Sequence, residues 1–128
     1  MDGKEKILYV DDETINLELF KINFRNEYDV VVANSAIKGL EILKGEPIKV
    51  VVSDLKMPVM NGLEFIEKVK GDNPARVCIL LTAFMESDVM LQAINKELIF
   101  RYIMKPWKKA ELEEVIRLAL VRHASLAG

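Results

Sequence analysis

Residues 7–13 read Ile7-Leu8-Tyr9-Val10-Asp11-Asp12-Glu13, a short apolar run that ends in three consecutive acidic residues. Four more short apolar runs follow along the chain, and most are rich in Val and Ile: Val30–Ala33, Val50–Val52, Val77–Leu81 and Ile99–Met104. Nearly continuous apolar runs, rather than alternating ones, are typical of parallel strands that are covered on both faces. We therefore expect five buried parallel strands.

Between and after these runs, apolar residues recur at helical spacing. The positions that mark five helices in turn are Ile15, Leu19 and Ile22; Ala36, Ile37, Leu40 and Leu43; Ile66 and Val69; Val89, Met90, Ala93 and Ile94; and Leu112, Val115, Ile116, Ala119 and Leu120. Asn34-Ser35 supplies an N-cap for the second helix, and Ser87 or Asp88 one for the fourth. Strictly alternating strands and helices predict one doubly wound α/β domain, spanning residues 1–128, around a parallel sheet.

Composition limits the possible functions. The chain has 128 residues and a formal net charge of −2, which gives no electrostatic reason to bind nucleic acid or an anionic membrane. No apolar run approaches the roughly 18–20 residues that a membrane span needs, and residues 1–6 lack the apolar segment of a secretory signal. The single cysteine, Cys78, lies inside an apolar run, as expected of a buried strand residue in a reducing compartment. We expect a single cytoplasmic domain.

The chemistry is expected where the strands end, because ligands of open α/β sheets bind outside the carboxyl ends of the strands. The polar residues that follow the first, third, fourth and fifth runs are Asp11, Asp12 and Glu13; Asp54; Thr82; and Lys105 with Pro106. Each of these residues alone has an ordinary explanation, such as a helix cap, a strand-end hydroxyl or a solvated lysine. Their joint placement at four strand ends instead predicts one site.

These residue types suit phosphoryl transfer. Close carboxylates repel one another unless a cation joins them, and a hard ion such as Mg²⁺ prefers oxygen ligands. With the metal present, one carboxylate can act as a nucleophile and form an aspartyl phosphate. Lys105 offers a compact positive charge and Thr82 a hydroxyl, and phosphoryl transfer depends mainly on such positioning and charge compensation.

The chain resembles the receiver domains of bacterial two-component response regulators over essentially its full length. The matching segments are Ile7–Glu13, Asp54-Leu55-Lys56-Met57-Pro58-Val59-Met60-Asn61-Gly62, Leu81-Thr82-Ala83 and Lys105-Pro106. The resemblance implies a flavodoxin-like sheet with strand order 2-1-3-4-5 and five helices. It also implies a domain that accepts phosphate in signal transduction, rather than an enzyme acting on other molecules.

The resemblance assigns roles to the matching residues. It implies that Asp54 is the phosphoacceptor and that Asp11, Asp12, Asp54 and the backbone carbonyl of Lys56 hold Mg²⁺, with Mn²⁺ as a substitute. It further implies phosphate contacts from Thr82 and Lys105, and a cis bond before Pro106. The side chains two residues beyond Asp54 and Thr82, Lys56 and Phe84, are expected to tune the lifetime of the phosphate.

Partners and output also come from the resemblance. The phosphoryl donor is expected to be a sensor histidine kinase, a phosphotransfer protein or a small phosphodonor. Phosphorylation is expected to change the surface formed by the fourth helix, fifth strand and fifth helix, which controls an output domain or partner protein and is a candidate surface for homodimerisation. Tyr102 resembles the aromatic residue that reports this switch, although a half-buried strand aromatic explains it equally well.

Three other classes of protein share parts of this pattern. A haloacid-dehalogenase-type phosphatase needs two aspartates separated by one residue after the first strand, whereas Asp11 and Asp12 are adjacent. A flavodoxin-like electron carrier needs a phosphate-binding loop there, and the acidic segment Asp11–Glu13 would repel a phosphate. A receiver-like docking module that is not phosphorylated is the remaining alternative, and it is disfavoured because no site residue is missing.

Overall fold

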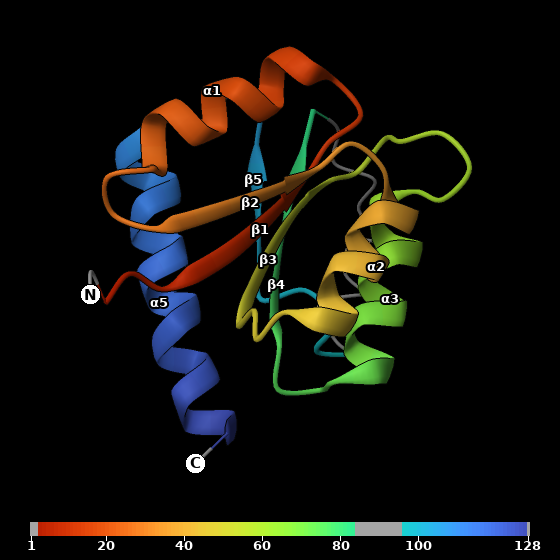
Figure 1. Cartoon of the computed structure of the whole chain (residues 1–128), viewed down its shortest axis with the longest axis vertical. Coiled ribbons are helices and arrows are strands. Elements are labelled where there is room, and N and C mark those ends of the chain that lie inside the picture. The colour runs from red at the N-terminus through yellow and green to blue at the C-terminus, as the bar shows by residue number, and fades with distance from the viewer. Residues whose placement is uncertain (1–2, 84–95, 128) are drawn as a thin grey trace.

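The structure is a computed structural model that describes residues 3–83 and 96–127. Five parallel strands form one sheet in the order β2-β1-β3-β4-β5, as predicted (Figure 1). The strands are β1 (Lys6–Val10), β2 (Asp29–Ala33), β3 (Val50–Asp54), β4 (Val77–Thr82) and β5 (Arg101–Met104). The helices within the described residues are α1 (Thr14–Phe24), α2 (Ala36–Gly45), α3 (Gly62–Asp72) and α5 (Lys109–Ala127). The helix predicted around Val89, Met90, Ala93 and Ile94 lies outside the described residues, together with its cap at Ser87 or Asp88.

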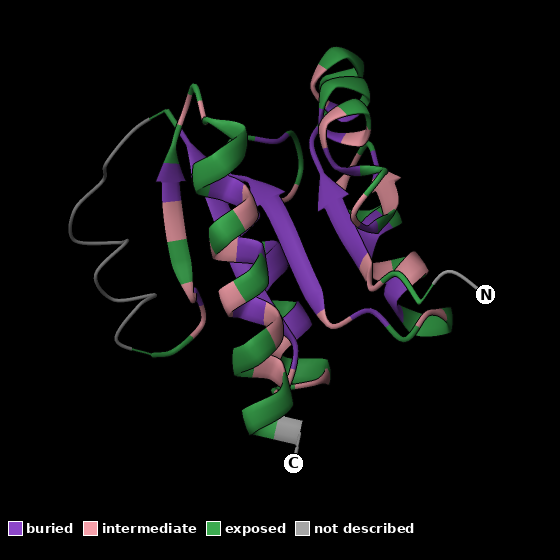
Figure 2. Cartoon of the chain, turned by 90° about the vertical axis from the view of Figure 1, so that its left-hand side faces the viewer, coloured by how far each residue is buried: buried purple, intermediate pink, exposed green. Residues whose placement is uncertain are grey.

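Both faces of the sheet are covered. Ile7 and Tyr9 of β1 pack in a cluster with α1 and α5, whereas the intervening residues, Leu8 and Val10, pack in a second cluster with α2 and α3. Figure 1 shows the corresponding layers, with α1 and α5 on one side of the sheet and α2 and α3 on the other. The central strands are buried along their length and the helices expose their outer faces (Figure 2). The continuous apolar runs of the sequence therefore correspond to strands that are covered on both faces, as predicted.

Helix α1 forms where predicted, but the apolar residues that mark it in the sequence are not the ones that are buried. Ile15, Leu19 and Ile22 are exposed, at 73%, 48% and 55% of their surface. The buried positions are Leu17, Phe20 and Phe24. The helix is apolar on two sides, and its aromatic side chains remove more surface from water when buried than the aliphatic stripe does. The sequence pattern alone does not indicate which of the two apolar sides of α1, the aliphatic or the aromatic one, faces the core.

Two further details differ from what the sequence pattern suggests, and one agrees with the prediction. Ile37 of α2 is exposed, and its place toward the sheet is taken by Gly39, which lies against Phe65 and Val10. Strand β5 begins at Arg101, so Ile99 is a buried residue of the preceding loop. The Ser35 hydroxyl caps α2 by accepting a hydrogen bond from the Lys38 amide, as predicted (3.1 Å).

Trp107 lies just before α5 and anchors its start against α1. Its ring centroid lies 6.2 Å from that of Phe20 and 5.8 Å from that of Phe24. Cys78 is buried in β4, as predicted, and burial raises the pKa of its thiol to about 12. Within the described part of the chain, no helix is both long and apolar enough to cross a lipid bilayer.

Candidate functional site

The predicted site residues meet at the carboxyl edge of the sheet. Asp11 and Asp12 directly follow β1, Asp54 and Thr82 end β3 and β4, and Lys105 follows β5. Hydrogen bonding between neighbouring strands continues into these positions. The Asp11 amide donates to the Ala33 carbonyl (3.1 Å), and the Lys105 amide donates to the Thr82 carbonyl (2.8 Å). The hydrogen bonding of the sheet therefore fixes the backbone positions from which these side chains extend.

Three carboxylates form an acidic cluster there. Asp11, Asp12 and Asp54 can each present an oxygen so that the three atoms lie within 4.8 Å of one another. Asp11 is fully buried, Asp54 is 7% exposed, and Asp12 is exposed. Lys105 reaches into the cluster, with its Nζ 2.6 Å from Oδ1 of Asp54 and 3.8 Å from Oδ2 of Asp11. Three negative charges thus face one positive charge.

The electrostatics of the site favour a bound cation. Burial raises the pKa of Asp54 above its usual value, although the hydrogen bond and charge of Lys105 work in the opposite direction. The cluster offers only oxygen ligands, which suit hard divalent cations, and it leaves an excess of negative charge at a largely buried position. Asp11, Asp12 and Asp54 are therefore a group that could hold a metal ion.

Asp11 has two side-chain partners that sequence reasoning missed. The Tyr9 hydroxyl donates to Oδ2 of Asp11 (2.5 Å), and the Asn16 amide nitrogen donates to the same oxygen (3.1 Å). Tyr9 is itself 1% exposed, and burial together with its hydrogen bond to Asp11 keeps the pKa of its hydroxyl far above the ordinary value. A tyrosine among aliphatic strand residues, two positions before an aspartate, is the signal that could have revealed this contact.

The loop after Asp54 is fixed by its own sequence. Asn61 caps α3 in a reciprocal capping box with Glu64. The next residue must be glycine, because a β-carbon at Gly62 would collide with the carbonyl oxygen of Asp54. Within this loop Val59 is 93% exposed and has a φ of 71°, which is strained for a β-branched residue. The Asn61-Gly62 pair therefore holds the start of α3 directly against the end of β3 at Asp54.

The remaining predicted residues differ in their burial. Thr82 is buried at the end of β4, Tyr102 is half-buried on β5, and the side chain of Lys56 is exposed. The peptide bond between Lys105 and Pro106 is cis. Phe84, the second predicted lifetime residue, lies outside the described residues.

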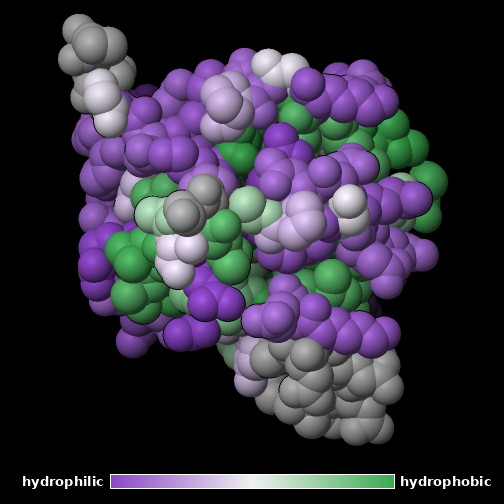
Figure 3. All heavy atoms as spheres, turned by 90° about the horizontal axis from the view of Figure 1, so that it is seen from below, coloured by the Kyte–Doolittle hydropathy of each residue, from purple (hydrophilic) through white to green (hydrophobic). Residues whose placement is uncertain are grey.

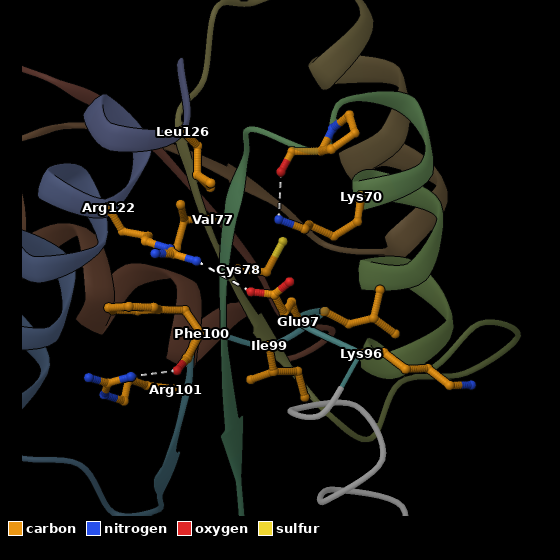
Figure 4. A pocket seen from close by; sticks show the side chains of 12 residues that line it. Lys70, Val77, Cys78, Lys96, Glu97, Ile99, Phe100, Arg101, Arg122 and Leu126 are labelled. Atoms are coloured by element: carbon orange, nitrogen blue, oxygen red, sulfur yellow. Dashed lines mark hydrogen bonds and ion pairs between the residues drawn. The ribbon is translucent and has the colours of Figure 1, made fainter. Parts of the chain in front are cut away.

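A cavity of about 650 Å³ lies at the opposite, amino edge of the sheet. The molecule seen from below is mostly hydrophilic on this side, with smaller apolar areas between the charged groups (Figure 3). Figure 4 shows Lys70 and Arg122, two of the cations that line the cavity, with partners in the chain. Lys70 donates to two backbone carbonyls of the turn before β4 (2.7 and 2.8 Å), and Arg122 pairs with Glu97 (3.4 Å). This cavity holds none of the predicted site residues.

Comparison with known proteins agrees with the geometry. Residues 7–117 match the family model of the response regulator receiver domain. The hydrogenase transcriptional regulatory protein HoxA of Cupriavidus necator is 29% identical over 119 residues, which cover 93% of this chain and 25% of HoxA. The chain thus spans about a quarter of the length of this curated relative.

Solved structures give the same result. A response regulator receiver domain protein from Clostridium thermocellum superposes with a TM-score of 0.88 at 32% identity, covering 95% of this chain and 98% of that one. Response regulator protein TrrA from Thermotoga maritima, solved in complex with Mg²⁺ and BeF, has a TM-score of 0.81 at 27% identity, covering 90% and 98%. The chain belongs to the response regulator receiver domain family of two-component systems.

Proposed function

We propose that this receiver domain takes a phosphoryl group on Asp54, with Mg²⁺ held by Asp11, Asp12, Asp54 and the backbone carbonyl of Lys56. The observation that carries the proposal is the contact of Asp54 with Lys105 (2.6 Å) inside a cluster of three carboxylates. A merely structural aspartate would need one cation partner, and the two additional carboxylates would be unfavourable neighbours. Mn²⁺ can replace Mg²⁺ at such an oxygen-only site.

The residues of the chain supply most of the chemistry. A carboxylate oxygen of Asp54 forms a bond to phosphorus while the bond from phosphorus to the donor breaks, and the donor keeps that electron pair. Lys105, already beside Asp54, compensates negative charge on the transferred group, and Thr82 offers its hydroxyl to a phosphoryl oxygen. Bound Mg²⁺ would neutralise the carboxylates and the phosphoryl oxygens. The domain would thus assist only its own phosphorylation and dephosphorylation, with Lys56 and Phe84 influencing the lifetime of the phosphate.

The surface next to the site suits a protein donor. The exposed residues Ile15, Leu19 and Ile22 form a stripe on α1. A cavity of about 520 Å³ between this helix and the residues after β5 is lined by Leu19, Lys105 and Trp107, among others. Because Lys105 also touches Asp54, this apolar surface leads directly to the acidic cluster. It supports a sensor histidine kinase or a phosphotransfer protein as the cytoplasmic donor.

The output is proposed to lie on the side of β5. Tyr102 is half-buried there and packs against the cluster of α2 and α3, so a change in its rotamer would alter the surface around it. In the proposed switch, phosphate binding by Thr82 favours one of two packings of this edge. The altered surface, formed by the fourth helix, β5 and α5, would control an output domain or partner protein, or pair with a second copy. Residues 1–128 act as one receiver domain in this proposal.

Intact-mass measurement after incubation with acetyl phosphate tests the function. The wild type is expected to gain one phosphoryl group only when Mg²⁺ is present, and Asp54→Asn is expected to gain none. Asp72→Asn, which alters an aspartate at the end of α3, is the matched control and should be phosphorylated normally. If the wild type forms no adduct and also fails to bind BeF with Mg²⁺, a docking module that is not phosphorylated becomes the better explanation.

A further inference from the structure

The carboxylate of Asp11 is held by hydrogen bonds on both of its oxygens. Oδ2 accepts from the Tyr9 hydroxyl (2.5 Å) and from the Asn16 amide nitrogen (3.1 Å). Oδ1 accepts from the backbone amide of Glu13 (2.9 Å). Lys105 approaches Oδ2 to 3.8 Å, which is a charge interaction but too long for a hydrogen bond.

The acceptor capacity of Asp11 is therefore nearly filled. An ionised carboxylate offers about four lone-pair positions, two on each oxygen. Within residues 3–83 and 96–127, both positions of Oδ2 and one position of Oδ1 are used. The single position left belongs to Oδ1. Rotation of the carboxylate would break at least one of the three hydrogen bonds, so this position has a fixed direction.

We propose that Tyr9, assisted by Asn16, is a positioning residue that orients the Asp11 carboxylate and so presents the remaining acceptor position of Oδ1 to the divalent cation. The inference rests on the proposed function, because it concerns the same metal site. It gives a role to two residues, Tyr9 and Asn16, to which the family resemblance assigned none. Hydrogen bonds from neighbouring residues to metal-binding carboxylates generally fix their orientation and strengthen metal binding.

The surroundings of Tyr9 make it a rigid support. Its ring is 1% exposed and stacks on Phe20, with centroids 4.3 Å apart and planes 14° from parallel. Phe20 in turn packs against Phe24 and Trp107. The hydroxyl is therefore placed by the aromatic core between β1 and α1, and not by the flexible end of a surface side chain. Asn16, in the first turn of α1, adds a second donor from this helix.

Calorimetric titration with Mg²⁺ alone tests the proposal without phosphorylation. Tyr9→Phe keeps the ring and its stacking and removes only the hydroxyl. We expect its dissociation constant for Mg²⁺ to rise about tenfold. Tyr28→Phe is the matched control, because Tyr28 packs in the same aromatic cluster, next to Phe24. That control should bind Mg²⁺ as tightly as the wild type if the role of Tyr9 is positioning rather than packing.

A second pair of variants keeps the test valid should Tyr9→Phe fold poorly. Asn16→Ala is expected to weaken Mg²⁺ binding by a smaller factor. Asn23→Ala is its control, because Asn23 lies on the same helix and donates to the Leu19 carbonyl instead (2.8 Å). Unchanged Mg²⁺ affinity in Tyr9→Phe and Asn16→Ala would overturn the positioning role and leave the proposed function standing. A wild type that binds no Mg²⁺ would overturn both.

Discussion

The two edges of the sheet use charge in opposite ways. At the carboxyl edge, Asp11, Asp12 and Asp54 crowd around one ammonium group, Lys105, and the charges do not balance. At the amino edge, Lys70 and Arg76 instead donate to backbone carbonyls of the chain. Arg76 is 9% exposed and donates to the carbonyls of Ile48 (3.1 Å) and Leu43 (2.9 Å), which close the turn between α2 and β3.

The difference separates a structural use of charge from a functional one. A buried donor that fills backbone acceptors stabilises one arrangement and has nothing left to offer a ligand. A buried acidic cluster with an excess of negative charge destabilises the fold unless a cation binds to it. Such a cluster therefore favours binding of a cation or a transferred group. Variants at the two edges should accordingly change different measured quantities.

Lys105→Met should cause the largest change. Removing the ammonium beside Asp54 takes away charge compensation for the transferred group, and we expect phosphorylation by acetyl phosphate to slow by about 100-fold. Mg²⁺ should bind more tightly to this variant, because a competing positive charge has gone. Stopped-flow measurement of the phosphorylation rate and calorimetry of Mg²⁺ binding check the two effects.

The amino edge supplies the control for this experiment. Lys70→Met removes a lysine that bonds only to carbonyls in the part of the chain that the structure describes. Its phosphorylation rate should match the wild type while its unfolding temperature falls. A rate that drops equally in both lysine variants would mean that the two edges do not differ in the way proposed.

Arg76→Ala should lower stability without altering the chemistry. Its side chain donates hydrogen bonds to carbonyls at the end of α2 and before β3. Leaving these buried acceptors unpaired is expected to lower the free energy of unfolding by about 2 kcal/mol. Urea unfolding measures the loss, and Arg76→Lys should recover only part of it, because lysine lacks the planar fork of arginine. A normal phosphorylation rate at low temperature is expected of both variants, and a large loss of rate in a folded sample would argue against a purely structural role.

Much of the fold could be predicted because its signals are local. Each apolar run became a strand within one or two residues, since parallel strands buried on both faces need continuous apolar sequence. The buried face of α1 could not be predicted, because Ile15, Leu19 and Ile22 have the same helical spacing as the residues that face the core. Only the tertiary contacts of Phe20 and Phe24 distinguish the two stripes.

The site was predictable to the same extent. Polar residues at strand ends converge by topology, so the meeting of Asp11, Asp54 and Lys105 follows from chain order alone. The hydroxyl of Tyr9 was missed because its partner depends on the direction of a side chain inside the core. The role of Arg76 was missed for a similar reason, because its acceptors are backbone carbonyls about 30 residues away in sequence. Every residue has such a carbonyl, so the sequence does not indicate which ones an arginine will contact.

The smallest expected effect tests whether the carboxyl edge is costly in the absence of metal. Burial raises the pKa of Asp54 despite the opposing effect of Lys105, so the folded state binds this proton more tightly than the unfolded state does. Ionised Asp54 therefore lowers the stability of the fold above its folded-state pKa. This loss is recovered as the pH falls through that value toward the unfolded-state pKa of about 4. Without divalent cations, Asp54→Asn should melt about 3 °C higher than the wild type at neutral pH, and the difference should shrink in acid. Calorimetric melting across this pH range checks the sign. A lower melting temperature for Asp54→Asn at neutral pH would mean that the attraction of Lys105 outweighs burial, and that the two edges are more alike than their charges indicate.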